Sequence, residues 1–216
     1  MLVPMRAILD AADKNGYAQG AFNVNAVCQV KAAVDVHQIL RSPAIIQGAD
    51  LANGFMGGRT DFANSTLEDK KAGAKNIGAA VKKYAADSDI PVALHLDHGK
   101  NFDSCIAAIE GGYTSVMIDG SSLPFDENVE LTREVVKYAH ERGVTVEGEL
   151  GVLAGVEDHV FAATSTYTNP LSAIDFFKKT GVDALAISYG TMHGANKGKN
   201  ACLLYTSPSP RDKRQS

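Results

Sequence analysis

A short polar segment directly after an apolar run carries the densest set of chemically useful side chains. His95-Leu96-Asp97-His98-Gly99 offers two imidazoles and one carboxylate. A neutral imidazole nitrogen binds a divalent ion such as zinc, and a neighbouring carboxylate suits proton transfer. Strand alternation places His95 and Asp97 on one face, while a turn at the strand end lets Asp97 and His98 point the same way. The alternative is a capped strand end with an ion-paired aspartate.

Two acidic residues, Glu147 and Glu149, stand two positions apart in a second apolar run. They share a strand face, and buried like charges are costly without a cation or a proton between them. A bound metal ion would remove that cost. The alternative is a pair of carboxylates that form ion pairs inside the fold.

A glycine-rich stretch, Gly190–Gly198, follows a third apolar run and contains His193, Gly194 and Lys197. Glycine allows close approach of the backbone to a ligand, and exposed amides can hold a phosphate. Lys197 adds a positive charge. The alternative is an ordinary glycine-rich turn.

Strands and helices must alternate to position these three groups. Short runs rich in Val, Ile and Ala predict buried strands, and apolar residues three and four apart predict helices. The expected strands are Gly20–Val24, Pro43–Gln47, Pro91–Leu96, Ser115–Ile118, Val144–Leu150 and Ala184–Tyr189. The expected helices cover Pro4–Lys14, the stripe Val27, Val30 and Val34, Thr66–Ala86, Phe102–Glu110, a helix with Asp126 as N-cap, and Pro170–Thr180, with a long loop at Gly151–Thr168.

Six strand-then-helix units in a row predict an α/β fold with a parallel sheet. Both an open doubly wound sheet and a (β/α)₈ TIM barrel satisfy this pattern. Polar residues stand at or just beyond the carboxyl ends of the runs, namely Asn25, Gln47, Asp97, His98, Asp119 and Glu149. These ends converge on one mouth in a barrel, and the first turn lacks the glycine-rich phosphate loop of an open dinucleotide-binding sheet. The barrel is therefore favoured.

The length of the chain limits how much of a barrel it can build. A complete barrel needs about 250 residues, whereas the pattern here stops after about six βα units and changes texture near Lys199. We therefore expect a partial TIM-barrel domain over residues 1–200. Residues 201–216, with two prolines and no period, are expected to be a disordered or non-native tail.

Composition excludes several classes of partner. The formal net charge of −4 argues against nucleic-acid binding. No apolar run approaches the roughly 18 residues of a membrane span, and the N-terminus shows no signal-peptide pattern. The three scattered cysteines, Cys28, Cys105 and Cys202, show no disulfide-like spacing. We expect a cytoplasmic protein.

Five segments in order resemble signatures of the class II, zinc-dependent fructose-bisphosphate aldolase family. They are Gly20–Asn25, Leu94–Gly99, Val116–Ser121, Glu147–Gly151 and Gly190–Gly194. The resemblance runs from the N-terminus to about Asn200. It implies a TIM barrel that uses a bound metal ion and a small phosphorylated sugar.

The resemblance also implies roles for individual residues. His98 and His193 look like zinc ligands, and Glu149 like a carboxylate near the metal. Asp97 looks like the group that takes the proton from the C4 hydroxyl, and Glu157 like a mobile acid in the long loop. The implied substrate-binding residues are Asn25, Asp119, Gly194 and Lys197.

The implied activity is reversible, Zn²⁺-dependent cleavage of fructose 1,6-bisphosphate to dihydroxyacetone phosphate and glyceraldehyde 3-phosphate, a step of glycolysis and gluconeogenesis. A homodimer or larger assembly is implied for the full-length protein. The sequence departs from the family pattern in lacking a third zinc histidine after a seventh strand and in having Ala49 where many members carry serine. Two alternatives remain open: a tagatose-bisphosphate or other ketose-phosphate aldolase, and an inactive truncated barrel fragment.

Overall fold

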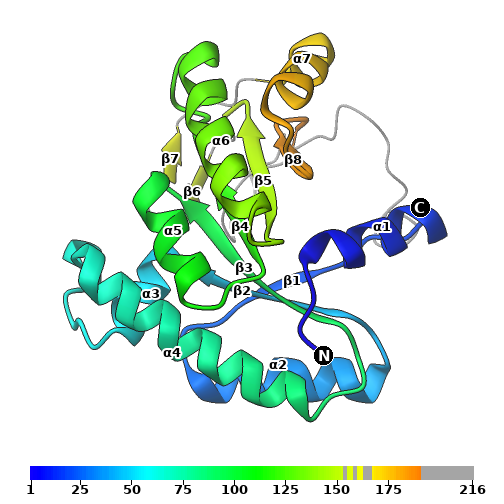
Figure 1. Ribbon diagram of the computed structural model, residues 1–216, viewed down its shortest axis with the longest axis vertical. Helices are drawn as coiled ribbons and strands as arrows, with labels where there is room; N and C mark the ends of the chain where they lie inside the picture. The colour runs from blue at the N-terminus through cyan, green and yellow to red at the C-terminus, as the bar shows by residue number, and fades with distance from the viewer. Residues whose placement is uncertain (153–154, 158–159, 163–166, 191–216) are drawn as a thin grey trace.

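The computed structural model describes residues 1–152, 155–157, 160–162 and 167–190. Six parallel strands form one sheet in the order β1-β2-β3-β4-β5-β8 (Figure 1). The strands are β1 Ala21–Asn23, β2 Ala44–Ala49, β3 Val92–Gly99, β4 Ser115–Ile118, β5 Thr145–Leu150 and β8 Ala184–Ile187. The helices are α1 Met5–Asn15, α2 Val27–Leu40, α3 Asp50–Met56, α4 Leu67–Ala86, α5 Phe102–Glu110, α6 Phe125–His140 and α7 Pro170–Thr180, with a 3₁₀ turn at Phe62–Asn64.

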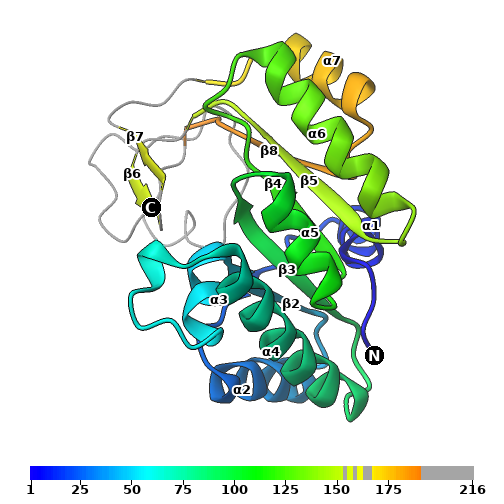
Figure 2. The ribbon, with the colours of Figure 1, turned by 60° about the vertical axis from the view of Figure 1, so that its left-hand side comes forward.

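The main hydrophobic core lies between the sheet and the helices that cover its outer face. Figures 1 and 2 show α2, α4, α5 and α6 following one another along that face. Alternate strand residues point into this layer, among them Ile46, Leu94, Val116 and Val146, all buried. Burial of this apolar surface is the main favourable contribution to the fold.

A smaller core occupies the inner face of the sheet near the start of the strands. Met5 and Ile8 of α1 pack there against Ile45 and Ala93. The backbone N–H of Arg6 donates to Thr145 Oγ1 over 3.1 Å, which ties α1 to β5. Figure 2 shows α1 and the small β6–β7 hairpin at opposite ends of the sheet, so the carboxyl ends of the strands face away from α1.

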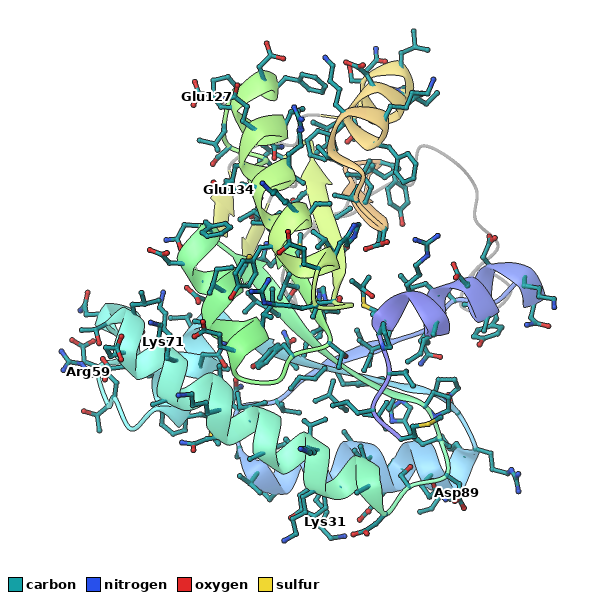
Figure 3. The ribbon with its side chains drawn as sticks, viewed as in Figure 1. Lys31, Arg59, Lys71, Asp89, Glu127 and Glu134 are labelled. Carbon is teal, nitrogen blue, oxygen red and sulfur yellow. The ribbon has the colours of Figure 1, made fainter. Side chains whose placement is uncertain are left out.

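Charged side chains cover the outward faces of the helices. Figure 3 labels Lys31, Lys71, Glu127 and Glu134, which point away from α2, α4 and α6. The outer helices therefore show the expected division between a charged face and an apolar face.

Local sequence explains where several helices begin and end. Thr66 and Asp69 form a reciprocal capping box at the start of α4. At α7, the Asn169 side chain accepts from two backbone amides and Pro170 occupies the first turn. Gly181 ends α7 with φ +72°, a left-handed conformation that glycine adopts without steric cost.

Most predicted elements are confirmed within a few residues, and three differences stand out. Asp126 was expected to cap its helix, but α6 begins at Phe125 with Pro124 as N-cap, so Asp126 lies in the first turn. The short helix α3 was not predicted. The long loop at Gly151–Thr168 contains a two-stranded antiparallel hairpin, β6 Gly155–Glu157 with β7 Val160–Ala162.

The predicted fold class is confirmed, because six parallel strands and the helices between them form an incomplete barrel in the described residues. In the described part of the chain, β1 and β8 each pair with a single neighbour, so both are edge strands. The predicted boundary near residue 200 and the tail 201–216 lie outside the described residues. None of the described helices is both long enough and apolar enough to cross a membrane.

Candidate metal centre

The end of β3 presents two consecutive polar side chains to the mouth of the incomplete barrel. The β3–β4 register shifts between Leu96 and Gly99. His98 has φ +49°, a left-handed conformation that is rare for a non-glycine residue and costs about 1–3 kcal/mol. This irregularity interrupts strand alternation, so that neither Asp97 nor His98 is turned into the outer core. Strain of this kind clusters at functional sites.

Gly99 follows at a point where the two strands come close. A Cβ at Gly99 would lie 2.6 Å from the Met117 carbonyl oxygen and 3.0 Å from Cys105 Sγ. The Gly99 carbonyl accepts from the backbone N–H of Asp119 over 2.9 Å. Glycine at this position therefore lets β3 approach β4 and brings Asp119 beside His98.

His98 lies between two carboxylates from neighbouring strand ends. Its Nδ1 is 3.0 Å from Asp119 Oδ2, just beyond β4, and 3.6 Å from Glu149 Oε2 on β5. One ligand atom from each of these three residues lies within 4.8 Å of the others. His98 and Glu149 are buried and Asp119 is nearly so.

Two further side chains support this cluster, one at the Asp119 carboxylate and one at the backbone of Glu149. The backbone N–H and the hydroxyl of Ser121 both donate to Asp119 Oδ1, over 3.1 and 2.6 Å. The buried amide of Asn128 in α6 donates to the Glu149 carbonyl over 2.9 Å. Sequence reasoning did not identify Ser121 or Asn128 as site residues. The signal that could have identified Ser121 is its position in a turn two residues after Asp119. From there its backbone N–H and its hydroxyl both reach the Asp119 carboxylate.

The charges of this cluster determine the proton affinity of His98. Burial alone lowers the pKa of the imidazole, but the hydrogen bond to Asp119 and the charges of Asp97, Glu149 and Asp119 outweigh it and raise the pKa to about 9. Burial raises the pKa of Asp119, whereas its hydrogen bonds with His98 and Ser121 lower it more, so the net pKa falls below the ordinary value.

The donor set fits a divalent metal ion. One imidazole nitrogen and two carboxylate oxygens are the ligand types that zinc accepts. Three carboxylates, Asp97, Asp119 and Glu149, act on a single imidazole, and a bound cation would neutralise their excess negative charge. The predicted ligands His98 and Glu149 are thus brought together. Asp119, predicted to bind substrate, lies in the same group.

Asp97 lies beside these residues and contacts a residue that sequence reasoning passed over. The Asn23 side-chain amide donates to Asp97 Oδ2 over 3.3 Å. In the parallel sheet, Asn23 of β1 is the register partner of Gln47 of β2. Two residues further along β2, Ala49 is the register partner of Asp97 of β3. Strand alternation puts Asn23 and Asn25 on the same face, so it does not separate them; the end of β1 at Asn23 does.

Asn25, the residue predicted to bind substrate, is exposed two positions further along. Its backbone N–H donates to Gln29 Oε1 over 2.6 Å. Its side chain lines a hollow of about 280 Å³ together with apolar and aromatic residues, namely Leu51, Ala52, Phe55 and Phe62. The structure does not bring Asn25 against the Asp97–His98 pair.

The remaining predicted site residues stay as predictions. His193, Gly194 and Lys197 lie outside the described residues. The backbone of Glu157 ends strand β6 of the hairpin, and its side chain is not among those described.

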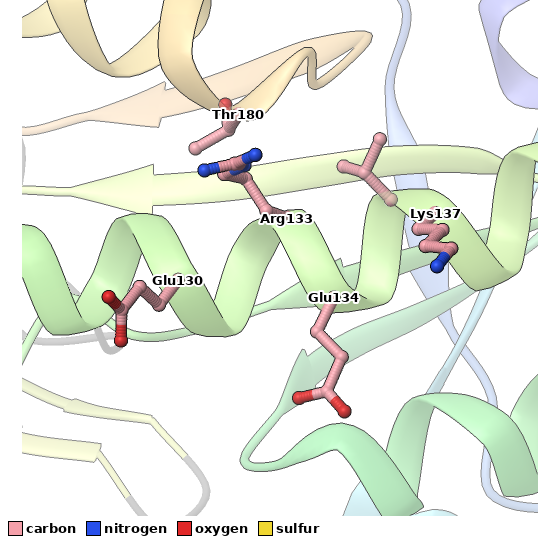
Figure 4. Close-up of a pocket in the computed structure, with 6 residues that line it drawn as sticks. Glu130, Arg133, Glu134, Lys137 and Thr180 are labelled. Atoms are coloured by element: carbon pink, nitrogen blue, oxygen red, sulfur yellow. The ribbon is translucent and has the colours of Figure 1, made fainter.

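A separate hollow of about 370 Å³ opens between α6 and α7, on the outside of the fold (Figure 4). Its lining includes Glu130, Arg133, Glu134 and Lys137 of α6 and Thr180 of α7. None of these side chains belongs to the cluster at the strand ends. The candidate site is therefore the barrel mouth.

The chain matches a family model described as fructose-bisphosphate aldolase class-II over residues 3–206. It belongs to the class II fructose-bisphosphate aldolase family. A curated fructose-bisphosphate aldolase from Treponema pallidum is 48% identical over 200 residues, covering 91% of this chain and 56% of the relative. The Geobacillus stearothermophilus fructose-bisphosphate aldolase is 40% identical, covering 92% and 64%. The chain thus spans between half and two thirds of these class II aldolases.

Solved structures agree with this family. The crystal structure of the YdjI aldolase from Escherichia coli K12 has a TM-score of 0.73 and 30% identity, covering 94% of this chain and 66% of that one. A Campylobacter jejuni fructose-bisphosphate aldolase also gives 0.73, at 24% identity and covering 94% and 62%, and shows the shared fold. The family resemblance predicted from the five sequence segments is confirmed.

Proposed function

We propose that this chain carries the chemistry of a metal-dependent ketose-bisphosphate aldolase, with fructose 1,6-bisphosphate as substrate. The products would be dihydroxyacetone phosphate and glyceraldehyde 3-phosphate. The observation that carries the proposal is the His98–Asp119–Glu149 group beside Asp97 at the strand ends. Family membership and relatives named fructose-bisphosphate aldolase support the choice of substrate.

Asp97 is the proposed proton acceptor. Cleavage removes a proton from the C4 hydroxyl as the C3–C4 bond breaks, and a positioned carboxylate suits that transfer. The amide of Asn23, 3.3 Å from Asp97 Oδ2, orients the carboxylate toward the mouth. Burial of Asp97 limits competing contact with bulk water.

Zn²⁺ is the proposed metal, held by His98 and Glu149, with His193 as a predicted further ligand. When bound, a divalent cation supplies positive charge for the oxygen that becomes anionic in cleavage. Asp119, anchored by Ser121, keeps the His98 ring oriented toward that position.

Other parts of the account remain predictions. Gly194 and Lys197 are expected to hold a substrate phosphate, and Glu157 to serve as an acid from the loop. Asn25 and Asp119 were predicted to contact substrate, but contacts of Asp119 favour a place in the metal group. A cytoplasmic location and a homodimer or larger assembly of the full-length protein are part of the same proposal.

The test is cleavage of fructose 1,6-bisphosphate by the purified chain, monitored by appearance of the two triose phosphates. We expect slow cleavage that EDTA abolishes and Zn²⁺ restores, because the described sheet has six strands and two open edges. Tagatose 1,6-bisphosphate assayed in parallel tests the alternative substrate. Cleavage that is insensitive to EDTA would contradict the proposal.

A second candidate is a non-catalytic barrel fragment. The observation in its favour is that the chain spans 56% and 64% of two curated relatives. This candidate predicts that Zn²⁺ and substrate bind by calorimetry without turnover, whereas the aldolase proposal predicts binding with metal-dependent turnover.

A further inference from the structure

A second histidine–carboxylate contact lies inside the incomplete barrel, beneath the candidate metal centre. His95 on β3 is 2% exposed. Its Nδ1 is 2.8 Å from Ser115 Oγ on β4, and its Nε2 is 3.3 Å from Glu147 Oε2 on β5. The Ser115 hydroxyl donates in turn to Met5 Sδ of α1 over 3.7 Å. The His95 ring thus connects β3 with its neighbour β4 and with β5, the next strand beyond.

These contacts are unusual for their position. Barrel interiors are filled mainly by branched apolar side chains, and Ile45 and Ala93 follow that rule nearby. The His95 ring is buried and the Glu147 side chain is 23% exposed. Such a contact is weak evidence for stability, because the desolvation of the groups offsets much of the attraction. The pair therefore suggests a role in geometry.

The strands that the His95 ring connects also carry the metal group. His95 lies three residues before His98 on β3, and Glu147 lies two residues before Glu149 on β5. The ring crosses over β4 to reach Glu147, so it connects the two strands that do not pair directly. Any change in the β3–β5 separation here changes the distance between His98 and Glu149.

We propose that His95, through Ser115 and Glu147, is a positioning residue that sets the spacing between His98 and Glu149 in the metal centre. This inference rests on the proposed metal-dependent function. His95 itself contacts neither metal nor substrate in this proposal. Its effect reaches the site through the backbone of β3 and β5.

The primary test is Co²⁺ binding, followed by the visible absorption of the bound ion and by calorimetry. We expect His95→Phe to weaken Co²⁺ binding by about tenfold or more, as for loss of groups that orient metal ligands. His95→Gln, which can still bond to Ser115 and Glu147, should recover most of that affinity. The absorption spectrum of bound Co²⁺ should also change in His95→Phe, because ligand geometry changes.

His140 provides a matched control. Its Nε2 contacts Asp183 Oδ2 over 2.9 Å at the opposite end of the sheet, so it forms a similar pair remote from the mouth. His140→Phe should change thermal stability with Co²⁺ affinity unchanged. Equal Co²⁺ affinity in His95→Phe and the unaltered chain would overturn the positioning role, as would an equal loss of affinity in His140→Phe.

A second measurement does not require metal binding. It uses two variants, so it remains informative if one of them fails to fold. Crystal structures of metal-free His95→Phe and Glu147→Leu, each of which removes the contact between His95 and Glu147, should show His98 Nδ1 and Glu149 Oε2 separated beyond the present 3.6 Å. An unchanged separation would overturn the inference. If the unaltered chain binds no Co²⁺, the metal proposal fails, and these structures still decide the positioning role.

Discussion

Asp97 and His98 are adjacent in sequence but carry different parts of the proposed chemistry. Asp97 accepts from Asn23, whereas His98 faces Asp119 and Glu149. The two side chains reach different partners because His98 has a positive φ, which interrupts the regular strand between the two residues. A regular strand would have pointed one of them into the outer core.

Replacing Asp97 by asparagine tests its role as proton acceptor. Asparagine keeps the shape and the contact with Asn23 but cannot accept the proton. We expect the rate of fructose 1,6-bisphosphate cleavage to fall by about 10²–10⁴-fold, the usual contribution of a general base. Zn²⁺ binding by calorimetry should be retained. Unchanged cleavage by Asp97→Asn would exclude this role.

The high pKa of His98 predicts how metal affinity depends on pH. Metal binding requires the deprotonated imidazole, so protons compete with the metal below a pKa of about 9. Apparent Zn²⁺ affinity should therefore rise by about tenfold per pH unit between about pH 7 and pH 8, where an ordinary histidine is already deprotonated.

Calorimetric titrations at several pH values check this dependence, with His98→Gln as the control in which the slope should be lost. A flat profile above about pH 7 would show that the surrounding carboxylates do not raise the pKa of His98 in solution.

At the residue scale, the sequence identified residues that the structure brings together. Residue type alone distinguishes His95–Gly99 and the pair Glu147 and Glu149, and the family resemblance implies His98 and Glu149 as ligands. In the structure both side chains lie in one cluster with Asp119, and their roles there stay predictions. The resemblance implies Asn25 as a substrate-binding residue, whereas β1 ends at Asn23 and the Asn23 side chain is the one that contacts Asp97. Where a strand ends depends on its pairing with a neighbour, and that pairing is not visible in the sequence of one strand.

Among the elements, β3 has the greatest effect on the site. The ends of β3 and β4 come into contact for three reasons: the register of β3 is irregular there, Gly99 allows close approach, and the Asp119 N–H donates to the Gly99 carbonyl. The metal group depends on this contact because His98 and Asp119 come from the two sides of it.

Gly99→Ala tests the importance of that approach. The new Cβ would lie 2.6 Å from the Met117 carbonyl, a backbone atom that cannot move without shifting β4. We expect a loss of about 1–3 kcal/mol in the free energy of unfolding, measured in urea, and weaker Zn²⁺ binding. Gly20→Ala is the control, because there a Cβ meets only the ring of exposed Phe22. Equal stability of the two variants would contradict this interpretation of β3.

The longer helices were predictable from the spacing of their apolar residues, with or without a side-chain cap. Their exact starts depend on local contacts, such as the Thr66 cap of α4 and the Asn169 cap of α7. Asp126 was taken for an N-cap, but proline at 124 already sets the backbone for entry into α6. The helix α3 has seven residues and was missed because two turns are too short to show a clear period.

At the scale of the whole molecule, the part that the structure describes has two edge strands, β1 and β8, with exposed apolar side chains on helices beside them. The helix α7 exposes Leu171, Ile174 and Phe177 near edge strand β8. The helix α2, after edge strand β1, exposes Val36, Ile39 and Leu40. Unpaired edges and apolar surface together favour association.

We therefore expect the purified chain to associate as its concentration rises. Ile174→Glu with Phe177→Glu should raise the concentration needed for half-association by about tenfold or more, because each removes apolar surface. Lys178→Glu on the same helix is the control for added negative charge. Sedimentation velocity measures the effect. A chain that stays monomeric at high concentration would contradict it.

The six parallel strands were predictable because each strand run in the sequence is separate. The sequence shows six strand runs, whereas a closed TIM barrel has eight strands, so two unpaired edge strands were expected. The β6–β7 hairpin was not predicted, because its three-residue strands lie inside a long loop and are too short to stand out there by alternation.

The central claim is that the strand-end cluster is a metal centre. Zinc-soaked crystals examined at wavelengths on both sides of the zinc absorption edge test it most directly. We predict an anomalous peak about 2.0–2.2 Å from a His98 ring nitrogen and from a carboxylate oxygen of Glu149 or Asp119. A fully soaked crystal without a peak there, or with zinc bound only elsewhere, would contradict the account.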